Sequence, residues 1–518
     1  MQQVAAERYS VLSTQYSVLV LLIAGGLALW LLELGRESLW LDEAGRAAIA
    51  ALPLGAIPSA VGVIELSPPL YHLLLHGWLR LAGDGDAALR LLSVLLGAAA
   101  IPATYALARE LTGRRAALLT AVLASVAPLY AAYAQEVAMY ALLALLALIA
   151  VWAHVRFTRT GSTPSLLAYA GTMLLALYTH YYALFLLAAQ NADVLWLARR
   201  GALPPGAGRR WLVAQAALAV AFVPWLPMLG QQAGLAASVG DWVAPDPLAA
   251  LGSLTLALSV GDVIDLPAVL AALAFLPALV AGVWRLRRRP EVLALVACYA
   301  LVPLALALLA AAPLHAFRER GFIAVAWVPQ LLVAIGLAGA GSFWPTARGT
   351  RGWATADQAS RWLQAAHPLG RAAYGAGLAL LLAYGAVAMI RAPKEDWRTA
   401  ATLIAALGRD GDVIYLMHYG SQLALDRYLP PGLPRVGLPD DFTWQHGYTA
   451  RYRLEPDDLD RRVAPALAGR QRAWVVLSHA DGRGDQLLLD YFDARYPAML
   501  RQDFYGVRVR LWALQPSP

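Results

Sequence analysis

The chain has 518 residues, of which 59% are hydrophobic and 14% charged, and its mean hydropathy is +0.54. This composition excludes a soluble globular domain and predicts an integral membrane protein. The net charge of +7 comes from short Lys and Arg clusters between apolar runs, which is typical of cytoplasmic loops and does not indicate a nucleic-acid partner. Cys298 is the only cysteine, so neither an intramolecular disulfide nor a thiolate metal site is possible.

The apolar runs predict about eleven transmembrane helices in the plasma membrane, with the amino terminus in the cytoplasm. They cover residues 18–34, 89–108, 116–133, 138–155, 165–197 as two helices, 211–229, 266–284, 292–311, 322–340 and 372–390. The run 165–197 is too long for one crossing, so it is divided at the aromatic residues 178–182, which are expected at the outer surface. This assignment places every basic loop on one side and puts residues 231–262, with Asp241 and Trp242, in an outer loop.

The first outer loop contains a short apolar segment, residues 68–81, that we expect to lie in the membrane interface rather than cross it. His72, His76 and Arg80 recur every fourth residue and form a polar stripe. The opposite side is apolar and consists of Leu70, Leu73, Leu74, Trp78 and Leu81. His72 and His76 also have the spacing of metal ligands, but the segment offers no acid on the same turn, which favours a simple polar stripe.

The composition changes after Arg391, so the chain is expected to consist of a transmembrane domain, residues 1–391, and an extracytoplasmic α/β domain, residues 392–518. Within the second domain the patterns predict helices at 396–407 and 485–496 and buried strands at 411–417 and 474–478. An edge strand is expected at 507–514, and the prolines between residues 430 and 439 indicate a loop.

The acidic residues expected on the outer side of the membrane include Asp42, Glu43, Glu65 and Glu136. Asp42 and Glu43 follow the first span, and Glu136 lies in the connection 134–137. Carboxylates at the mouth of an apolar bundle are costly to desolvate and therefore tend to persist where they bind or accept a proton. We expect Asp42 and Glu136 to face one cavity, although a solvated loop pair is the alternative for Asp42 and Glu43. Glu65 and His72 are further cavity candidates, and a cap of the following helix is the default role for Glu65.

Four motifs, taken in order, resemble those of the GT-C glycosyltransferases. They are Leu39-Trp-Leu-Asp-Glu-Ala, Ser67-Pro-Pro-Leu-Tyr, Tyr133-Ala-Gln-Glu-Val-Ala-Met-Tyr and Tyr178-Thr-His-Tyr. The resemblance points to the bacterial branch similar to protein O-mannosyltransferases and aminoarabinose transferases, the glycosyltransferase family 39 type. Lys394-Glu-Asp-Trp-Arg, at the start of the second domain, also resembles that branch. Two positions depart from it: Ala138 stands where the family often has Arg, and Arg320-Gly321 stands where it has an Arg-Tyr pair.

The resemblance implies transfer of a sugar from a polyprenyl-phosphate donor to a lipid, glycan or protein hydroxyl at the outer membrane face, with inversion at the anomeric carbon. Such a reaction needs a carboxylate to take the proton of the acceptor, and Asp42 is our choice for this general base. Glu43 either holds the acceptor or a cation or is a solvated neighbour, and Glu136 is the second acid of the site.

The lipid phosphate that leaves needs cationic side chains, and Arg318 and Arg320 are the candidates. Their alternative role is snorkelling at a helix end. His180 and Tyr181 could contact the sugar or phosphate or belong to an interfacial aromatic belt, and Gln135 is grouped with these donor-binding residues.

Two further questions stay open from the sequence. Magnesium or manganese could bind between Asp42 and Glu136, because hard cations take oxygen ligands, but two carboxylates do not complete a site. The alternative function is a multi-span transporter or flippase of a lipid-linked sugar, which predicts ionisable residues in mid-span and paired broken helices. The spans are nearly free of charge at their centres, and this favours an enzyme.

Overall fold

The computed structural model describes residues 17–238, 246–261, 266–314, 317–338, 368–444, 454–478 and 483–514. The chain divides into two compact units. We call residues 1–32, 90–225 and 243–391 the helical unit, and residues 33–89, 226–242 and 392–518 the mixed unit. The expected cytoplasmic amino terminus, Asp241, Trp242 and the basic loop after residue 340 lie outside the described residues.

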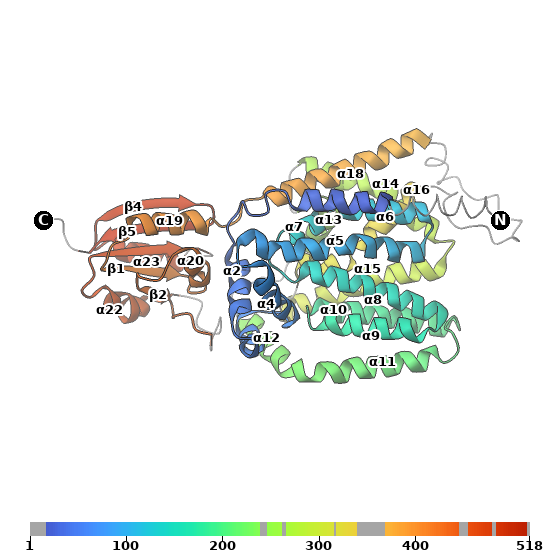
Figure 1. Cartoon of the computed structure of the whole chain (residues 1–518), viewed down its shortest axis with the longest axis horizontal. Coiled ribbons are helices and arrows are strands. Elements are labelled where there is room, and N and C mark those ends of the chain that lie inside the picture. The colour runs from blue at the N-terminus through green and yellow to red at the C-terminus, as the bar shows by residue number, and fades with distance from the viewer. Residues whose placement is uncertain are drawn as a thin grey trace, which may run out of the picture. The chain divides into compact units, whose positions relative to one another are not determined.

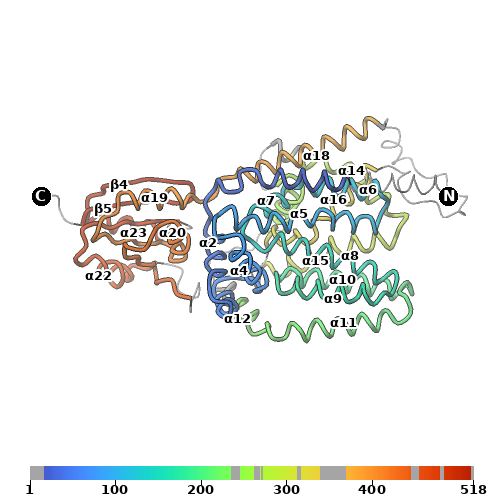
Figure 2. The backbone as a smooth tube through the Cα atoms, in the orientation of Figure 1, coloured from blue at the N-terminus to red at the C-terminus, as the bar shows by residue number. Residues whose placement is uncertain are grey.

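The helical unit is a bundle in which every predicted span has a helix (Figures 1 and 2). Its elements are the helix Ser17–Trp30, most of α5 (Asp86–Leu111), α6 (Arg114–Ser125), α7 (Pro128–Ala134), α8 (Tyr140–Thr160), α9 (Thr163–Leu177), α10 (Tyr182–Arg199), α11 (Ala207–Phe222), η2 (Val223–Trp225), α13 (Pro247–Ser259), α14 (Leu266–Leu286), α15 (Pro290–Leu314), η3 (Glu319–Val325), α16 (Trp327–Ala338) and α18 (Pro368–Arg391). Among the described residues, five helices are long and apolar enough to cross a membrane, or seven if two bent pairs are counted as spans, and shorter apolar helices accompany them.

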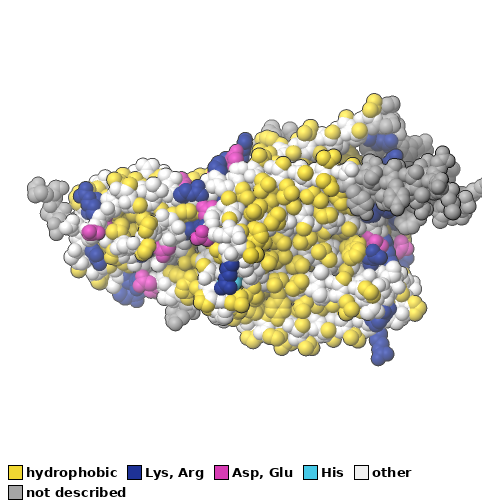
Figure 3. Space-filling model, viewed as in Figure 1, with side chains coloured by type: hydrophobic (Ala, Val, Ile, Leu, Met, Phe, Trp, Pro, Cys, Tyr) yellow, Lys and Arg dark blue, Asp and Glu magenta, His cyan; other side chains and the backbone are white. Residues whose placement is uncertain are grey.

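The surface of the helical unit is apolar. Hydrophobic side chains cover its visible face in Figure 3, and the outward-facing residues include Leu212, Val220, Leu301, Leu309 and Leu380. Inside, α14 and α16 approach backbone to backbone, because a Cβ on Gly336 would lie 2.0 Å from the carbonyl oxygen of Ala278. Small residues at helix contacts are how membrane bundles gain packing energy without a hydrophobic driving force. The expected polytopic membrane fold is confirmed.

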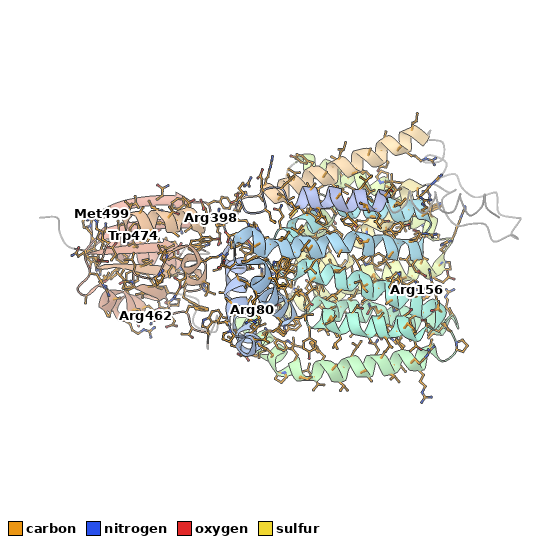
Figure 4. The ribbon with its side chains drawn as sticks, in the orientation of Figure 1. Arg80, Arg156, Arg398, Arg462, Trp474 and Met499 are labelled. Carbon is orange, nitrogen blue, oxygen red and sulfur yellow. The ribbon has the colours of Figure 1, made fainter. Side chains whose placement is uncertain are left out.

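The basic loops meet at one end of the helical unit. Arg159, after α8, pairs with Glu110 at the end of α5, and Arg289, before α15, donates to the carbonyl oxygen of Leu111 at 3.5 Å. Arg156 marks this end of α8 in Figure 4. The division of residues 165–197 is also confirmed, since α9 ends at Leu177 and α10 begins at Tyr182.

One expectation for the spans was wrong, and one buried ion pair was not foreseen. The predicted outer loop 231–262 contains α13, whose first turn is capped by Asp246: its side chain accepts hydrogen bonds from Leu248 N and Ala249 N. The bundle interior also holds an acid, because Asp193 of α10 is buried and its Oδ2 lies 2.9 Å from Nε2 of the equally buried His154 of α8.

The mixed unit combines α2 (Leu41–Ala51), η1 (Leu54–Ala56), α3 (Ile57–Ile64), α4 (Leu70–Ala82) and α12 (Leu226–Ser238) with a small sheet domain. Five strands have the order β2-β1-β3-β5-β4, where β1 (Asp412–Met417), β2 (Arg435–Leu438) and β3 (Arg472–Leu477) are parallel. β5 (Val507–Ala513) pairs antiparallel with β3 and with β4 (Ala498–Phe504). Helices α19 (Trp397–Leu407), α20 (Ser421–Tyr428), α21 (Pro456–Asp458), α22 (Ala464–Leu467) and α23 (Arg483–Asp493) accompany the sheet, as does the π-helical turn Leu459–Val463 (Figure 1).

The expected α/β domain is confirmed, with two corrections. The strand predicted at the edge, β5, lies between β3 and β4, so both of its sides are paired. The proline-rich segment 430–439, expected as a loop, contains β2 at the edge of the sheet. The core includes Tyr415, Val475, Phe492 and Trp512, all buried, and Figure 4 labels Trp474 on β3.

The helix predicted at 68–81 is present as α4, and part of its predicted polar stripe is buried. His72 and His76 are buried together with Tyr71 and Leu75, whereas Leu74 and Leu81 are exposed. The helix packs against α2 and α3, and His76 Nδ1 lies 2.8 Å from the carbonyl oxygen of Ala50 in α2.

Candidate functional site

Asp42 lies in the first turn of α2, where the helix dipole stabilises a negative charge. Its side chain is 32% exposed, which leaves one of the two adjacent carboxylates accessible to a substrate. Glu43 is fully buried, and its Oε2 lies 3.3 Å from Nζ of Lys394. The structure therefore excludes the solvated-neighbour alternative for Glu43.

Arg46 connects Asp42 to a second carboxylate. Its buried guanidinium places Nη2 3.3 Å from Oδ2 of Asp42, one turn away, and Nε 2.9 Å from Oε1 of Glu65. Burial alone would raise the pKa of Glu65, but the charge of Arg46 and the neighbouring His72 outweigh it and lower this pKa from 4.5 to about 2. We call Asp42, Arg46, Glu65 and His72 the acid cluster.

The expectation that Glu65 caps the helix after it was wrong. Glu65 follows the last residue of α3, and α4 begins after Pro69 without a side-chain cap. Its carboxylate is held by Arg46 instead, while Nε2 of His72 lies 3.9 Å from Glu65 Oε1. His76 does not join His72 as a second ligand, because its Nδ1 is 2.8 Å from the carbonyl oxygen of Ala50.

The helical unit gathers the other predicted residues into an arginine–aromatic cluster, which comprises Tyr140, His180, Tyr182, Arg318 and Arg320. The rings of Tyr140 and His180 lie 5.5 Å apart, and the Arg320 guanidinium lies 5.4 Å from the centre of the Tyr140 ring. Burial and the neighbouring Arg320 charge lower the pKa of Arg318. Two half-buried guanidinium groups that repel one another form a place where an anion is favourable.

Three contacts fix the segment that carries the two arginines. Tyr182 accepts a hydrogen bond from Arg318 N at 2.8 Å, and Ser253 of α13 donates to Glu319 Oε1 at 2.7 Å. At Gly321 a Cβ would lie 2.5 Å from Cδ1 of Tyr182, so the ring packs directly on the glycine backbone. Ser253 lies on α13, within the segment that was predicted to be an outer loop.

The remaining candidates of the helical unit lie near helix ends. Glu136, between α7 and α8, is 8% exposed, and Gln135 beside it donates to the carbonyl oxygens of Trp30 and Leu32 at 2.9 and 2.7 Å. Gln135 thus stabilises the end of the first helix. Tyr181 accepts a hydrogen bond from Trp225 Nε1 at 2.9 Å. Whether Asp42 and Glu136 share a cavity stays a prediction.

Arg46, Tyr140 and Tyr182 of these clusters, and Lys394 beside Glu43, were not predicted as site residues. Arg46 could have been found from its spacing, since an arginine four residues after Asp42 lies on the same helix face. Lys394 and Tyr140 lie inside family-like motifs and Tyr182 directly follows one, but their contacts join segments far apart in the chain. Within the described part of the chain, no group of three or more His, Cys, Asp and Glu side chains is arranged to hold a metal ion.

Comparison with known proteins agrees with this architecture. Residues 67–228 match the family described as dolichyl-phosphate-mannose-protein mannosyltransferase. The structure is similar to ArnT from Cupriavidus metallidurans in the apo state, with 16% identity, a TM-score of 0.60, and coverage of 96% of this chain and 97% of that one. For the same protein bound to undecaprenyl phosphate the values are 17%, 0.58, 96% and 98%.

The structure is also similar to the apo oligosaccharyltransferase of Archaeoglobus fulgidus, with 13% identity, a TM-score of 0.56, and coverage of 96% of this chain and 74% of that one. A comparison with curated protein sequences found no match. The family match and the fold together confirm the resemblance to the GT-C glycosyltransferases.

Proposed function

Because the chain has the GT-C glycosyltransferase fold, we propose that it transfers a sugar from a polyprenyl-phosphate donor to a hydroxyl of a lipid, glycan or protein, at the extracytoplasmic face of the plasma membrane. The observation that carries the proposal is the Asp42 carboxylate, which is accessible, lies at a helix amino terminus and is held by a buried arginine. The structure of ArnT bound to undecaprenyl phosphate supports a lipid phosphate as the carrier.

In the proposed reaction, Asp42 accepts the proton of the acceptor hydroxyl while the acceptor oxygen bonds to the anomeric carbon. The bond from that carbon to the phosphate oxygen breaks on the opposite side, so the configuration inverts and polyprenyl phosphate leaves. The Arg46 guanidinium, with Nη2 3.3 Å from Asp42 Oδ2, holds the carboxylate in place beside the acceptor. A positioned general base of this kind contributes roughly 10²- to 10⁴-fold in rate.

We assign to Arg318 and Arg320 the stabilisation of the negative charge that develops on the departing phosphate. Their segment is anchored by Tyr182 and Ser253 before substrate arrives, so the donor groups need little reorganisation when charge forms. The ring of Tyr140 contacts both Arg320 and His180. We propose that His180 and Tyr181 contact the sugar or the phosphate. Glu136 is proposed as the second acid of the site.

The competing function is transport or flipping of a lipid-linked sugar, and the Asp193–His154 pair is the observation in its favour. An ionisable pair inside a bundle is typical of proton-coupled carriers. Asp193 Oδ2, however, lies 2.9 Å from Nε2 of His154. The imidazole ring of His154 is in turn packed against the rings of Tyr169, Trp211 and Tyr299. This enclosure favours a structural contact between α8 and α10.

Purified protein incubated with synthetic polyprenyl-phosphate donors tests the proposal. Each donor carries one radiolabelled hexose or pentose, and candidate lipid, glycan and peptide acceptors are supplied together. We expect free polyprenyl phosphate and an acceptor-linked sugar of inverted configuration. Movement of intact donor across the bilayer of proteoliposomes, without cleavage of the sugar–phosphate bond, would support the transporter instead.

A further inference from the structure

The motif at the start of the sheet domain, Lys394-Glu-Asp-Trp-Arg, has no role in the proposed reaction, yet it is interlocked with the Asp42 segment. Ser38 Oγ donates to the carbonyl oxygen of Glu395 at 2.6 Å and accepts a hydrogen bond from Trp397 N at 3.1 Å. Ser38 and Trp397 are both buried. The Ser38 side chain therefore joins the backbone of this motif to the segment that leads into α2.

Glu395 supplies the cap that α2 lacks locally. Trp40, the residue before the first turn of α2, makes no side-chain cap hydrogen bond. Leu41 N donates instead to Glu395 Oε2 at 3.1 Å, across 354 residues of sequence. A carboxylate at this position satisfies an amide that the helix leaves open and complements the helix dipole.

The carboxylate of Glu395 is itself held by the sheet domain. Trp397 Nε1 donates to the same Oε2 at 2.7 Å, and Ser478 Oγ, after β3, lies 3.4 Å from Oε1. The turn between β4 and β5 closes over the side chain. Gly506 has a φ of +69°, and a Cβ there would lie 2.8 Å from Cγ of Glu395. A side chain at position 506 would therefore push Glu395 away from α2.

Lys394 makes a second contact with the same helical turn. Its Nζ lies 3.3 Å from Oε2 of the buried Glu43, the residue next to Asp42 in the chain. Glu395 thus binds the backbone amide of Leu41, and Lys394 binds the side chain of Glu43. Two consecutive residues of the sheet domain therefore hold two positions in the first turn of α2. Asp42 lies between these two fixed points.

We propose that Lys394 and Glu395 are positioning residues that fix the first turn of α2 and so set the direction of the Asp42 carboxylate. The sheet domain then has a specific task in catalysis, which is to hold the general base. This inference rests on the proposed function for its catalytic consequence, while the mechanical contact is independent of that function. A misplacement of a reacting group by roughly 1 Å costs about 100-fold in rate, so a loosened turn is sufficient to slow transfer.

The test compares full-length Glu395→Ala, Glu395→Gln, Lys394→Met and Asp42→Asn proteins with the wild type. The first measurement is amide hydrogen exchange of a peptide covering residues 39–47. We expect at least about tenfold faster exchange in Glu395→Ala, a smaller increase in Glu395→Gln because glutamine keeps an acceptor oxygen, and no change in Asp42→Asn. Peptides 412–417 and 472–477 report whether the sheet domain itself stays folded.

The second measurement is the rate of sugar transfer. We expect Glu395→Ala to lower kcat by about tenfold to 100-fold while KM for the donor changes less than about threefold. Arg501→Gln is the matched control, because Arg501 lies on β4 of the same domain and its exposed side chain pairs with the exposed Asp493. It should resemble the wild type in both measurements.

Unchanged exchange over residues 39–47 in Glu395→Ala would overturn the inference. Equal loosening of the two strand peptides would also overturn it, since Glu395 would then serve only the stability of the domain. If the wild type transfers no sugar, the proposed function fails. Faster exchange confined to residues 39–47 in Glu395→Ala would still establish that Glu395 fixes the first turn of α2.

Discussion

The ring of Tyr182 occupies the space into which a side chain at residue 321 would project, because a Cβ on Gly321 would lie 2.5 Å from Tyr182 Cδ1. The hydroxyl of the same tyrosine accepts the hydrogen bond of Arg318 N. The resembled family has an Arg-Tyr pair where this chain has Arg320-Gly321. In this chain a tyrosine of α10, Tyr182, packs on Gly321 instead, while the ring of Tyr140 from α8 lies next to Arg320.

Gly321→Ala should therefore displace Tyr182 and the arginine segment together. We expect the rate of sugar transfer to fall by at least about tenfold, since the two guanidinium groups would shift by a fraction of an ångström or more. The control is Gly171→Ala in α9, where a Cβ meets no atom within 4 Å. Wild-type activity in Gly321→Ala would show that the position of this segment does not matter.

Arg320→Gln should weaken binding of the lipid phosphate. Hydrogen bonds to charged groups are worth about 1.5–3 kcal/mol, which corresponds to roughly 10- to 100-fold in donor affinity. Arg320→Lys should recover only part of this loss, because an ammonium cannot match two phosphate oxygens in one plane. Binding of a fluorescent polyprenyl phosphate is the measurement, and the exposed Arg199→Gln on α10 is the control. Equal affinities for Arg320→Gln and Arg199→Gln would remove Arg320 from the donor site.

The buried pair of Arg46 and Glu65 predicts a specific pH dependence of stability. The pKa of Glu65 in the folded protein is about 2, below its ordinary 4.5. Its ionisation therefore contributes stability that is fully present above about pH 4.5 and is lost as the pH falls through about 2. Glu65→Gln should melt at a lower temperature than the wild type at pH 7, and the difference should shrink between pH 4.5 and 2.5. A difference that is constant with pH would contradict the ion pair.

The pair of His154 and Asp193 predicts a non-additive double mutant. His154→Phe leaves the Asp193 carboxylate buried without its partner, which should cost about 3–5 kcal/mol of stability. Replacing both residues, as His154→Phe with Asp193→Leu, should restore most of that loss, because two apolar side chains need no partner. Thermal unfolding of purified protein measures both effects. If instead the double mutant is stable but loses proton-coupled movement of the donor in proteoliposomes, the transporter function gains support.

The long apolar runs predicted where helices lie, because length and hydrophobicity are local properties of the sequence. Of the about eleven spans expected, five described helices are long and apolar enough to cross a membrane, or seven with the two bent pairs. Helix α13 was missed because its sequence is short for a span and follows a polar segment. Strand β4 was missed since most of its residues are exposed and polar, and its neighbour β5 was consequently assigned to the edge of the sheet. The burial of His72 and His76 in α4 was not predicted, because periodicity separates apolar from polar residues but does not say which side packs against the rest of the protein.

The sequence indicated individual candidate residues of the site, but it did not indicate which residues contact one another. Asp42, Arg318 and Arg320 were selected for their chemistry, which the amino-acid type alone provides. The partners that position them are Arg46, Glu65, Tyr182, Ser253, Lys394 and Glu395. Most of these contacts join segments that are tens to hundreds of residues apart, so only the folded chain reveals them.

The most direct test of the account is transfer of radiolabelled sugar from a synthetic polyprenyl-phosphate donor by purified wild type and Asp42→Asn. Asparagine keeps the size of the side chain and a hydrogen-bond acceptor for Arg46, but it does not take a proton from the acceptor hydroxyl. We predict a loss of about 10²- to 10⁴-fold in kcat with donor binding preserved. Full activity of Asp42→Asn would contradict the assignment of Asp42 as the general base.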